Sequence, residues 1–65
     1  MGKIEQNKEI KRRAILASAQ EIFLSEGYVL SSMDKIAAQA RMTKQTVYRY
    51  FPTKIDLFQA TLRHM

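Results

Sequence analysis

The sequence predicts an all-α domain, a three-helix bundle that contains a helix-turn-helix and is followed by the start of a fourth helix. Apolar residues recur at spacings of three and four, and no stretch alternates as a strand would. Serine, threonine, glycine and proline stand where these periodic stretches begin or end. With 65 residues and no cysteine, the chain has room for one small domain without a disulfide framework or a thiolate metal site.

The first predicted helix begins near Lys8 to Lys11 and ends at Glu26. Its inward positions, at spacings 0, 4, 7 and 8, are Ile15, Ala19, Ile22 and Phe23. Gly27 follows the last periodic residue, and we expect it to take the left-handed conformation that closes a helix. We expect Tyr28 to fold back onto the last turn as a packing residue.

The second predicted helix is short and opens in SSMDKIAAQA, residues 31–40. Ser32 is the favoured N-cap, and Ser31 is the alternative because Asp34 stands at the capping-box spacing from it. The inward positions, at spacings 0, 3, 4 and 7, are Met33, Ile36, Ala37 and Ala40. Because these residues are mostly small, a neighbouring helix can cross closely.

The third predicted helix covers residues 44–51 and follows Thr43, a good N-cap. Its inward residues, at spacings 0, 3 and 4, are Val47, Tyr50 and Phe51. Only Arg41 and Met42 separate Thr43 from Ala40, so the second and third helices must be joined by a tight turn and cross at a large angle.

Pro52 ends the third helix, Thr53 caps the fourth, and Asp56 holds the capping-box position. The inward residues of the fourth helix are Leu57, Phe58 and Leu62. Its pattern reaches Met65 without a terminating glycine or proline, so we expect the chain to be the head of a longer protein. The expected parts are a basic arm and helix start over 1–12, the helix-turn-helix domain over 13–52, and the start of a linker helix over 53–65.

The formal net charge of +5 is unevenly distributed. Residues 1–13 carry five bases and two acids, residues 14–31 carry two acids and no base, and residues 32–65 carry six bases and two acids. Between residues 41 and 54 there are four bases and no acid. Two basic zones favour a polyanionic partner, and the alternative is an ordinary solvated surface.

The outer face of the third helix is polar and carries Thr43, Lys44, Gln45, Thr46, Tyr48 and Arg49. Glutamine can bond adenine through two hydrogen bonds, lysine can reach guanine acceptors, and the threonine methyl can touch the thymine methyl. A short helix that follows a tight turn and leads with its N-terminal residues enters the DNA major groove in helix-turn-helix proteins. The pattern therefore predicts that residues 44–51 form a DNA recognition helix.

Three segments in this order resemble the TetR family of bacterial transcriptional regulators over about residues 13–62: ILASAQEIFLSEGY, SSMDKIA and TKQTVYRYFPTK. Two positions depart from the family pattern. Arg41 stands where the turn often has glycine, so it is expected to hold a positive φ at a cost of about 1 kcal/mol. Gln45 also stands where glycine is frequent, and it adds a side chain that can contact a base.

The resemblance implies two sets of DNA contacts. The base-contacting set is Lys44, Gln45, Thr46 and Arg49, of which Arg49 is equally suited to phosphate. The phosphate-contacting set is Ser32, Arg41, Thr43, Tyr48 and Lys54, with Ser32 acting through its backbone amide and Lys54 acting beside the start of its own helix. The arm from Lys3 to Arg13 is expected to follow the DNA backbone or the minor groove. The alternatives are that Tyr48 covers the core edge and that Gln45 and Thr46 are plain helix surface.

For the whole protein, the resemblance implies a cytoplasmic homodimer on double-stranded DNA with a palindromic operator, usually a repressor, whose C-terminal domain binds a small-molecule effector. We expect no catalytic residue, no metal, no cofactor and no membrane partner. The main alternative is a small basic helical module that binds an acidic protein or a membrane surface. Against this alternative, the bases surround the start of a short helix rather than flank one large apolar face.

Overall fold

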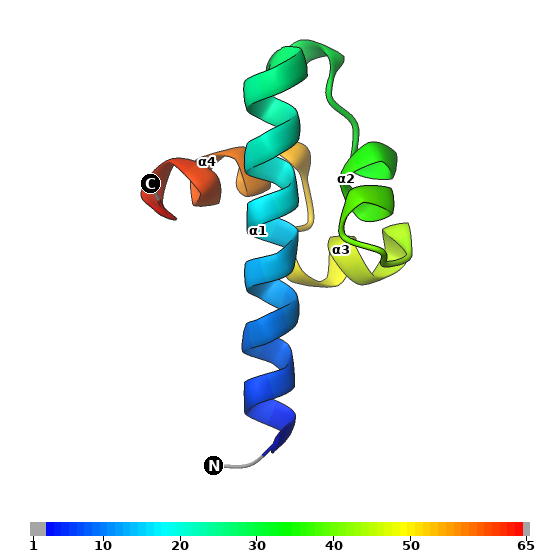
Figure 1. The fold of residues 1–65 in the computed structure, drawn as a ribbon, viewed down its shortest axis with the longest axis vertical. Helices are drawn as coiled ribbons and strands as arrows, with labels where there is room; N and C mark the ends of the chain where they lie inside the picture. Colours follow the sequence, from blue (N-terminus) through cyan, green and yellow to red (C-terminus); the bar gives the residue numbers. More distant parts are fainter. Residues whose placement is uncertain (1–2, 65) are drawn as a thin grey trace.

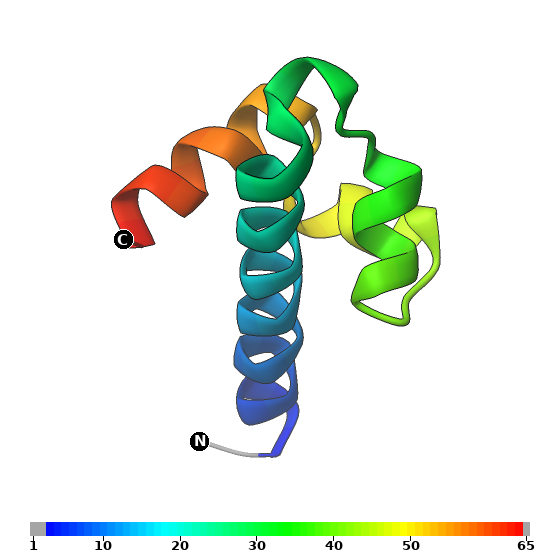
Figure 2. The ribbon, with the colours of Figure 1, turned by 45° about the horizontal axis from the view of Figure 1, so that its top comes forward.

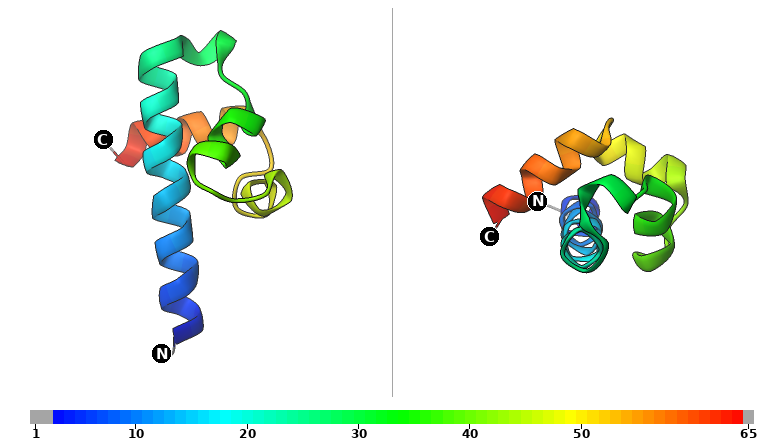
Figure 3. Two further views of the ribbon diagram at one scale, coloured as in Figure 1. Left: turned by 45° about the vertical axis from the view of Figure 1, so that its right-hand side comes forward. Right: turned by 90° about the horizontal axis from the view of Figure 1, so that it is seen from above.

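The chain folds into four helices with no strand among residues 3–64, whose backbone the computed structural model describes, together with the side chains of residues 8–64. The helices are α1 (Lys3–Leu30), α2 (Met33–Gln39), α3 (Lys44–Tyr50) and α4 (Lys54–His64). α1 runs along the 38 Å long axis, α2 and α3 lie together on one side of it, and α4 lies on the other (Figures 1 and 3). This arrangement confirms the all-α prediction.

The start of α1 differs from the prediction, because the helix begins at Lys3 and not at Lys8 to Lys11. The apolar pattern locates only the part of a helix that is buried. The residues before it include lysine, glutamate and glutamine, which favour helix without tertiary support. An ion pair between Arg13 Nε and Glu9 Oε2, 3.2 Å apart at i,i+4, adds to this preference. The N-terminal half of α1 therefore projects beyond the other three helices (Figures 1 and 2).

Gly27 breaks α1 where the sequence predicts, although in a different conformation. Its φ of 84° and ψ of 162° lie outside the left-handed helical region, in a region essentially restricted to glycine. One helical turn follows, in which the Ser31 amide donates to the carbonyls of Gly27 and Tyr28 at 3.2 and 3.3 Å. The break turns the chain toward α2 and places the Tyr28 ring back against the core, as expected.

The turn between α2 and α3 is a Schellman motif. The amide of Met42 donates to the carbonyl of Ala37 at 2.9 Å, and the amide of Arg41 donates to that of Ala38 at 3.1 Å. Arg41 has a φ of 60°, which confirms the predicted positive φ. Met42 packs against the core, as the motif's apolar residue commonly does.

Side-chain oxygens cap the three later helices as predicted. Ser32 Oγ accepts from the amide of Lys35, Thr43 Oγ1 accepts from that of Thr46, and Thr53 Oγ1 accepts from that of Asp56. α3 is one residue shorter than predicted, because Phe51 is its C-cap and has the extended φ and ψ typical of a residue before proline.

All four helices contribute to the core. The largest fully buried side chains are Ile15 and Leu16 of α1, Ile36 of α2, Val47 of α3 and Leu57 of α4. Leu16 was not among the predicted inward residues. An aromatic cluster of Phe23, Tyr28 and Phe58, with ring centroids 5.0 to 5.8 Å apart, joins α4 to the end of α1.

The inward prediction for Leu62 is wrong, because this side chain is 54% exposed and Thr61 is 3% exposed. Thr61 follows Leu57 by four residues and therefore lies on the same side of α4. Its hydroxyl donates to the carbonyl of Phe58 at 2.6 Å, which removes the penalty for burying it. Thr61, whose hydroxyl is hydrogen-bonded within α4, therefore occupies the buried position that the hydrophobic pattern had assigned to Leu62.

Candidate nucleic-acid interface

The side chains that the sequence assigns to DNA bases gather on the outer side of α3. Lys44, Gln45 and Arg49 are exposed, Thr46 is half-buried at the edge, and Val47 points into the core. Positions 44, 45, 48 and 49 share one side of a helix, so Tyr48 stands beside the base-contacting set. Tyr48 is 41% exposed, whereas Tyr50 packs against the core. The tyrosine that covers the core edge is therefore Tyr50.

Two threonine hydroxyls fix the start of α3. Thr43 Oγ1 accepts from the Thr46 amide at 3.2 Å and lies 2.9 Å from Thr46 Oγ1. A hydroxyl has two acceptor positions and one donor. When the Thr46 hydroxyl donates to that of Thr43, the Thr43 proton remains available to an outside acceptor such as a phosphate oxygen. Capping and phosphate contact are thus compatible at Thr43.

Lys44 forms an ion pair with a residue in the first turn of α2. Its Nζ lies 3.2 Å from Asp34 Oδ1, and the two side chains are 51% and 72% exposed. An ion pair this exposed contributes about 0–1 kcal/mol. The pair with Asp34 thus keeps Lys44 close to α2, but it is weak enough for Lys44 to exchange Asp34 for another partner.

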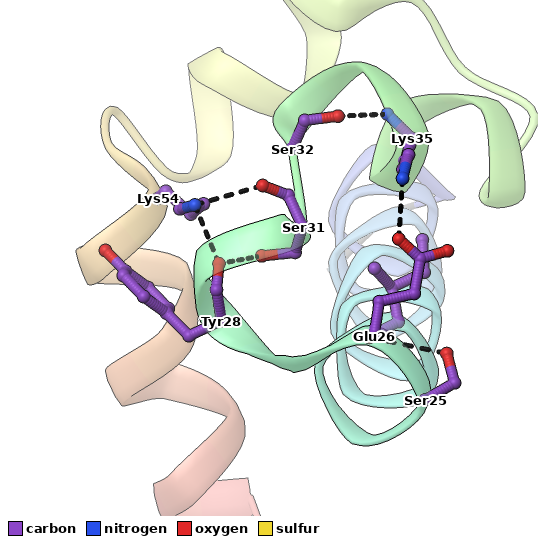
Figure 4. A network of polar contacts seen from close by, with 8 residues as sticks. Ser25, Glu26, Tyr28, Ser31, Ser32, Lys35 and Lys54 are labelled. Carbon is purple, nitrogen blue, oxygen red and sulfur yellow. Dashed lines mark hydrogen bonds and ion pairs between the residues drawn. The ribbon is translucent and has the colours of Figure 1, made fainter.

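Lys54 occupies a place that the sequence did not predict. Its Nζ donates to the carbonyls of Tyr28 at 2.8 Å and Ser31 at 3.0 Å, and lies 4.3 Å from the centroid of the Tyr28 ring (Figure 4). The Tyr28 carbonyl also accepts from the Ser31 hydroxyl at 2.6 Å. The ammonium group therefore donates hydrogen bonds to carbonyls at the end of α1. The sequence had predicted that it would lie beside the amide groups at the start of α4.

The other expected phosphate contacts lie at the ends of α2. Ser32 is half-buried with its hydroxyl committed to the Lys35 amide, and Arg41 is exposed in the turn. Lys35 is tied to α1, because its Nζ lies 2.6 Å from Glu26 Oε1 (Figure 4). Gln39 donates to Glu21 at 2.7 Å and makes a second link between α2 and α1. These links fix α2 without using the exposed residues of α3.

The structure places two lysines of the predicted basic arm beside α3, an arrangement that the sequence analysis did not predict. Lys8 and Lys11 of α1, together with Thr46, Arg49 and Tyr50 of α3, line a cavity of about 400 Å³. The i,i+3 spacing of the two lysines could have placed them on one side of a helix, but only if the helix had been predicted to begin before them.

No helix among the described residues is long and apolar enough to cross a membrane. Within the same part of the chain, no group of three histidine, aspartate or glutamate side chains is arranged to hold a metal ion.

Comparison with known proteins places this fold in a family. Residues 15–61 match the family described as bacterial regulatory proteins, tetR family. The chain belongs to the TetR family. It therefore carries the N-terminal, DNA-binding domain of the TetR family of transcriptional regulators. The matched residues include the whole of α2 and α3.

Several curated relatives of this TetR-family domain are transcriptional regulators. It is 36% identical over 59 residues to the HTH-type transcriptional activator FasR of Mycolicibacterium smegmatis, a match that covers 89% of this chain and 27% of that protein. It is 39% identical over 54 residues to the DNA-binding transcriptional repressor TetR of Mycobacteroides abscessus, covering 83% and 28%. It is 37% identical over 51 residues to the HTH-type transcriptional repressor BepR of Brucella suis, covering 78% and 24%. No solved structure matches.

The chain thus spans about a quarter of the length of these relatives. One relative is an activator and two are repressors, so membership of the TetR family does not fix the direction of regulation.

Proposed function

We propose that this domain binds double-stranded DNA sequence-specifically, with α3 as the recognition helix in the major groove. The observation that carries the proposal is the outer side of α3, where exposed polar and basic side chains follow a rigid turn and the helix is anchored from behind by Val47. In this geometry, the N-terminal residues of a recognition helix meet base edges. The proposed base contacts are Lys44, Gln45, Thr46 and Arg49.

Gln45 is the strongest candidate for base discrimination. It is exposed at the second position of α3, where a glutamine amide can form two hydrogen bonds with adenine. Lys44 can release Asp34 and bond the guanine acceptors, because the exposed pair costs little to break. Arg49, a turn later, is suited to a base or to the adjoining phosphate.

The proposed phosphate contacts surround this set and comprise Ser32, Arg41, Thr43, Tyr48 and Lys54. An ammonium group has three donors, and Lys54 uses two of them on carbonyls. The third donor is available to a phosphate without breaking either bond. We therefore expect Lys54 to act both as a structural link and as a phosphate contact.

For the whole protein, we propose a cytoplasmic homodimer that binds a palindromic operator, with repression relieved by a small molecule. The support is family membership together with the length of the relatives, which leaves about three quarters of each outside the match. A two-fold symmetric dimer presents two recognition helices to two half-sites, so operator symmetry follows from protein symmetry.

The test is selection of preferred duplexes from a random pool, followed by binding of Gln45→Ala to the selected duplex and to its single-base variants. Losing a bidentate contact removes about 1–3 kcal/mol of discrimination, or roughly 5- to 150-fold, at one base pair. Gln59→Ala, an exposed change on α4, is the matched control and should leave preference unchanged. Equal weakening on every duplex would refute base contact by Gln45. Binding to anionic vesicles but to neither heparin nor duplex would favour the interaction-module alternative.

A further inference from the structure

The cavity between α1 and α3 is basic, and none of the described residues that line it is acidic. Lys8 and Lys11 border it on α1, and Arg49 borders it on α3 with Thr46 and Tyr50. Its lining thus offers three cations together with the Tyr50 hydroxyl, which can donate a hydrogen bond. Oxygen-rich anions such as phosphodiesters are suited to this combination.

The two lysines of α1 that line this cavity, Lys8 and Lys11, are carried by a rigid helix. Residues 8 and 11 lie in the same unbroken helix that buries Ile15 and Leu16 in the core. One turn after Lys8, the guanidinium carbon of Arg12 lies 5.6 Å from the ring centroid of Phe51, directly after α3. The N-terminal half of α1 is therefore a fixed extension of the domain beside α3 (Figure 2).

The nearest described acid on α1 is directed elsewhere. Glu9 pairs with Arg13, and positions 9 and 13 lie on a different side of the helix from positions 8 and 11. The positive potential of the cavity is thus not cancelled by this carboxylate. The cavity also continues into the outer side of α3, because Arg49 belongs to both.

We propose that this cavity binds backbone phosphates of the DNA strand that borders the major groove occupied by α3. Lys8 and Lys11 would form a second phosphate-binding site, outside the helix-turn-helix, with Arg49 as its link to the recognition helix. This inference rests on the proposed function, and it assigns to α1 contacts with the DNA backbone.

The test is the salt dependence of binding to the selected duplex. Each phosphate neutralised by a lysine contributes about 0.9 to the slope of log K against log salt. Lys8→Gln combined with Lys11→Gln should make the slope shallower by about 1.8 and weaken every duplex by a similar factor. The control combines Lys35→Gln with Arg63→Gln, which removes the same charge at two exposed sites that do not line the cavity.

Two outcomes overturn the proposal: an unchanged slope in the lysine variant, or an equal change in the control, which would reduce the effect to net charge. Phosphate ethylation interference gives a second result, since the lysine variant should lose sensitivity at phosphates that the control retains. The proposed function is tested separately by the unmodified domain. If it selects no duplex, both proposals fail, whereas selection with unchanged lysine variants removes only the α1 site.

Discussion

Removing the Lys54 ammonium should destabilise the domain as well as weaken DNA binding. In Lys54→Met the unbranched stem and the helix preference are nearly kept, while two hydrogen bonds to the carbonyls of Tyr28 and Ser31 are lost. A hydrogen bond from a charged group contributes about 1.5–3 kcal/mol when buried. Lys54 is only half-buried, and the Tyr28 carbonyl keeps the Ser31 hydroxyl as a donor, so we expect a total loss of about 2 kcal/mol.

That loss is large for a domain of this size, because a core this small rarely supplies more than about 3–5 kcal/mol of net stability. The melting temperature should fall by about 8–16 °C, from the usual 4–8 °C per kcal/mol in small domains. Thermal unfolding followed by circular dichroism measures the shift, and urea unfolding gives the free energy.

Lys35→Met is the matched control, because it removes an ammonium that makes an exposed ion pair with Glu26. Such a pair contributes less than about 1 kcal/mol. If Lys54→Met lost no more stability than Lys35→Met, the bonds from Lys54 to the two carbonyls would make no net contribution to the stability of the fold.

Three further predictions concern the backbone and the core edge. Gly27→Ala should cost about 1–3 kcal/mol in urea unfolding, since its φ and ψ are strained for any side chain although the space around it is open; unchanged stability would contradict the strain. Arg41→Gly should change stability by less than about 1 kcal/mol, because relief of the positive φ is offset by unfolded-chain entropy, yet it should weaken all duplexes alike in titrations. Leu62→Gln should shift stability by less than about 0.5 kcal/mol, and a loss well above that would place Leu62 back in the core.

The sequence predicted the features that depend on local rules. Caps at Ser32, Thr43 and Thr53 follow from side-chain oxygens at the right spacing. The positive φ of Arg41 was predicted from the family resemblance, because this turn position often holds glycine. The outer side of α3 was also predictable, because α3 carries its core residues at regular helical spacing.

Features that depend on tertiary contacts were not predictable in the same way. The position of Lys54 required α4 to lie against the carbonyl end of α1, which no spacing within one helix reveals. Burial of Thr61 in place of Leu62 depended on how closely α4 approaches α1. The cavity at Lys8 and Lys11 depended on a helix start that carries no apolar signal.

The sharing of one core among four helices has a thermodynamic consequence for regulation. α3 has seven residues, far below the length at which an isolated helix is stable in water, so its shape exists only while Val47 is held by the other three helices. Binding competence and global folding are then a single equilibrium. A destabilising change anywhere in the core, even at Leu57 of α4, would weaken the DNA binding that we propose by reducing the folded fraction, without altering any of the proposed contact residues.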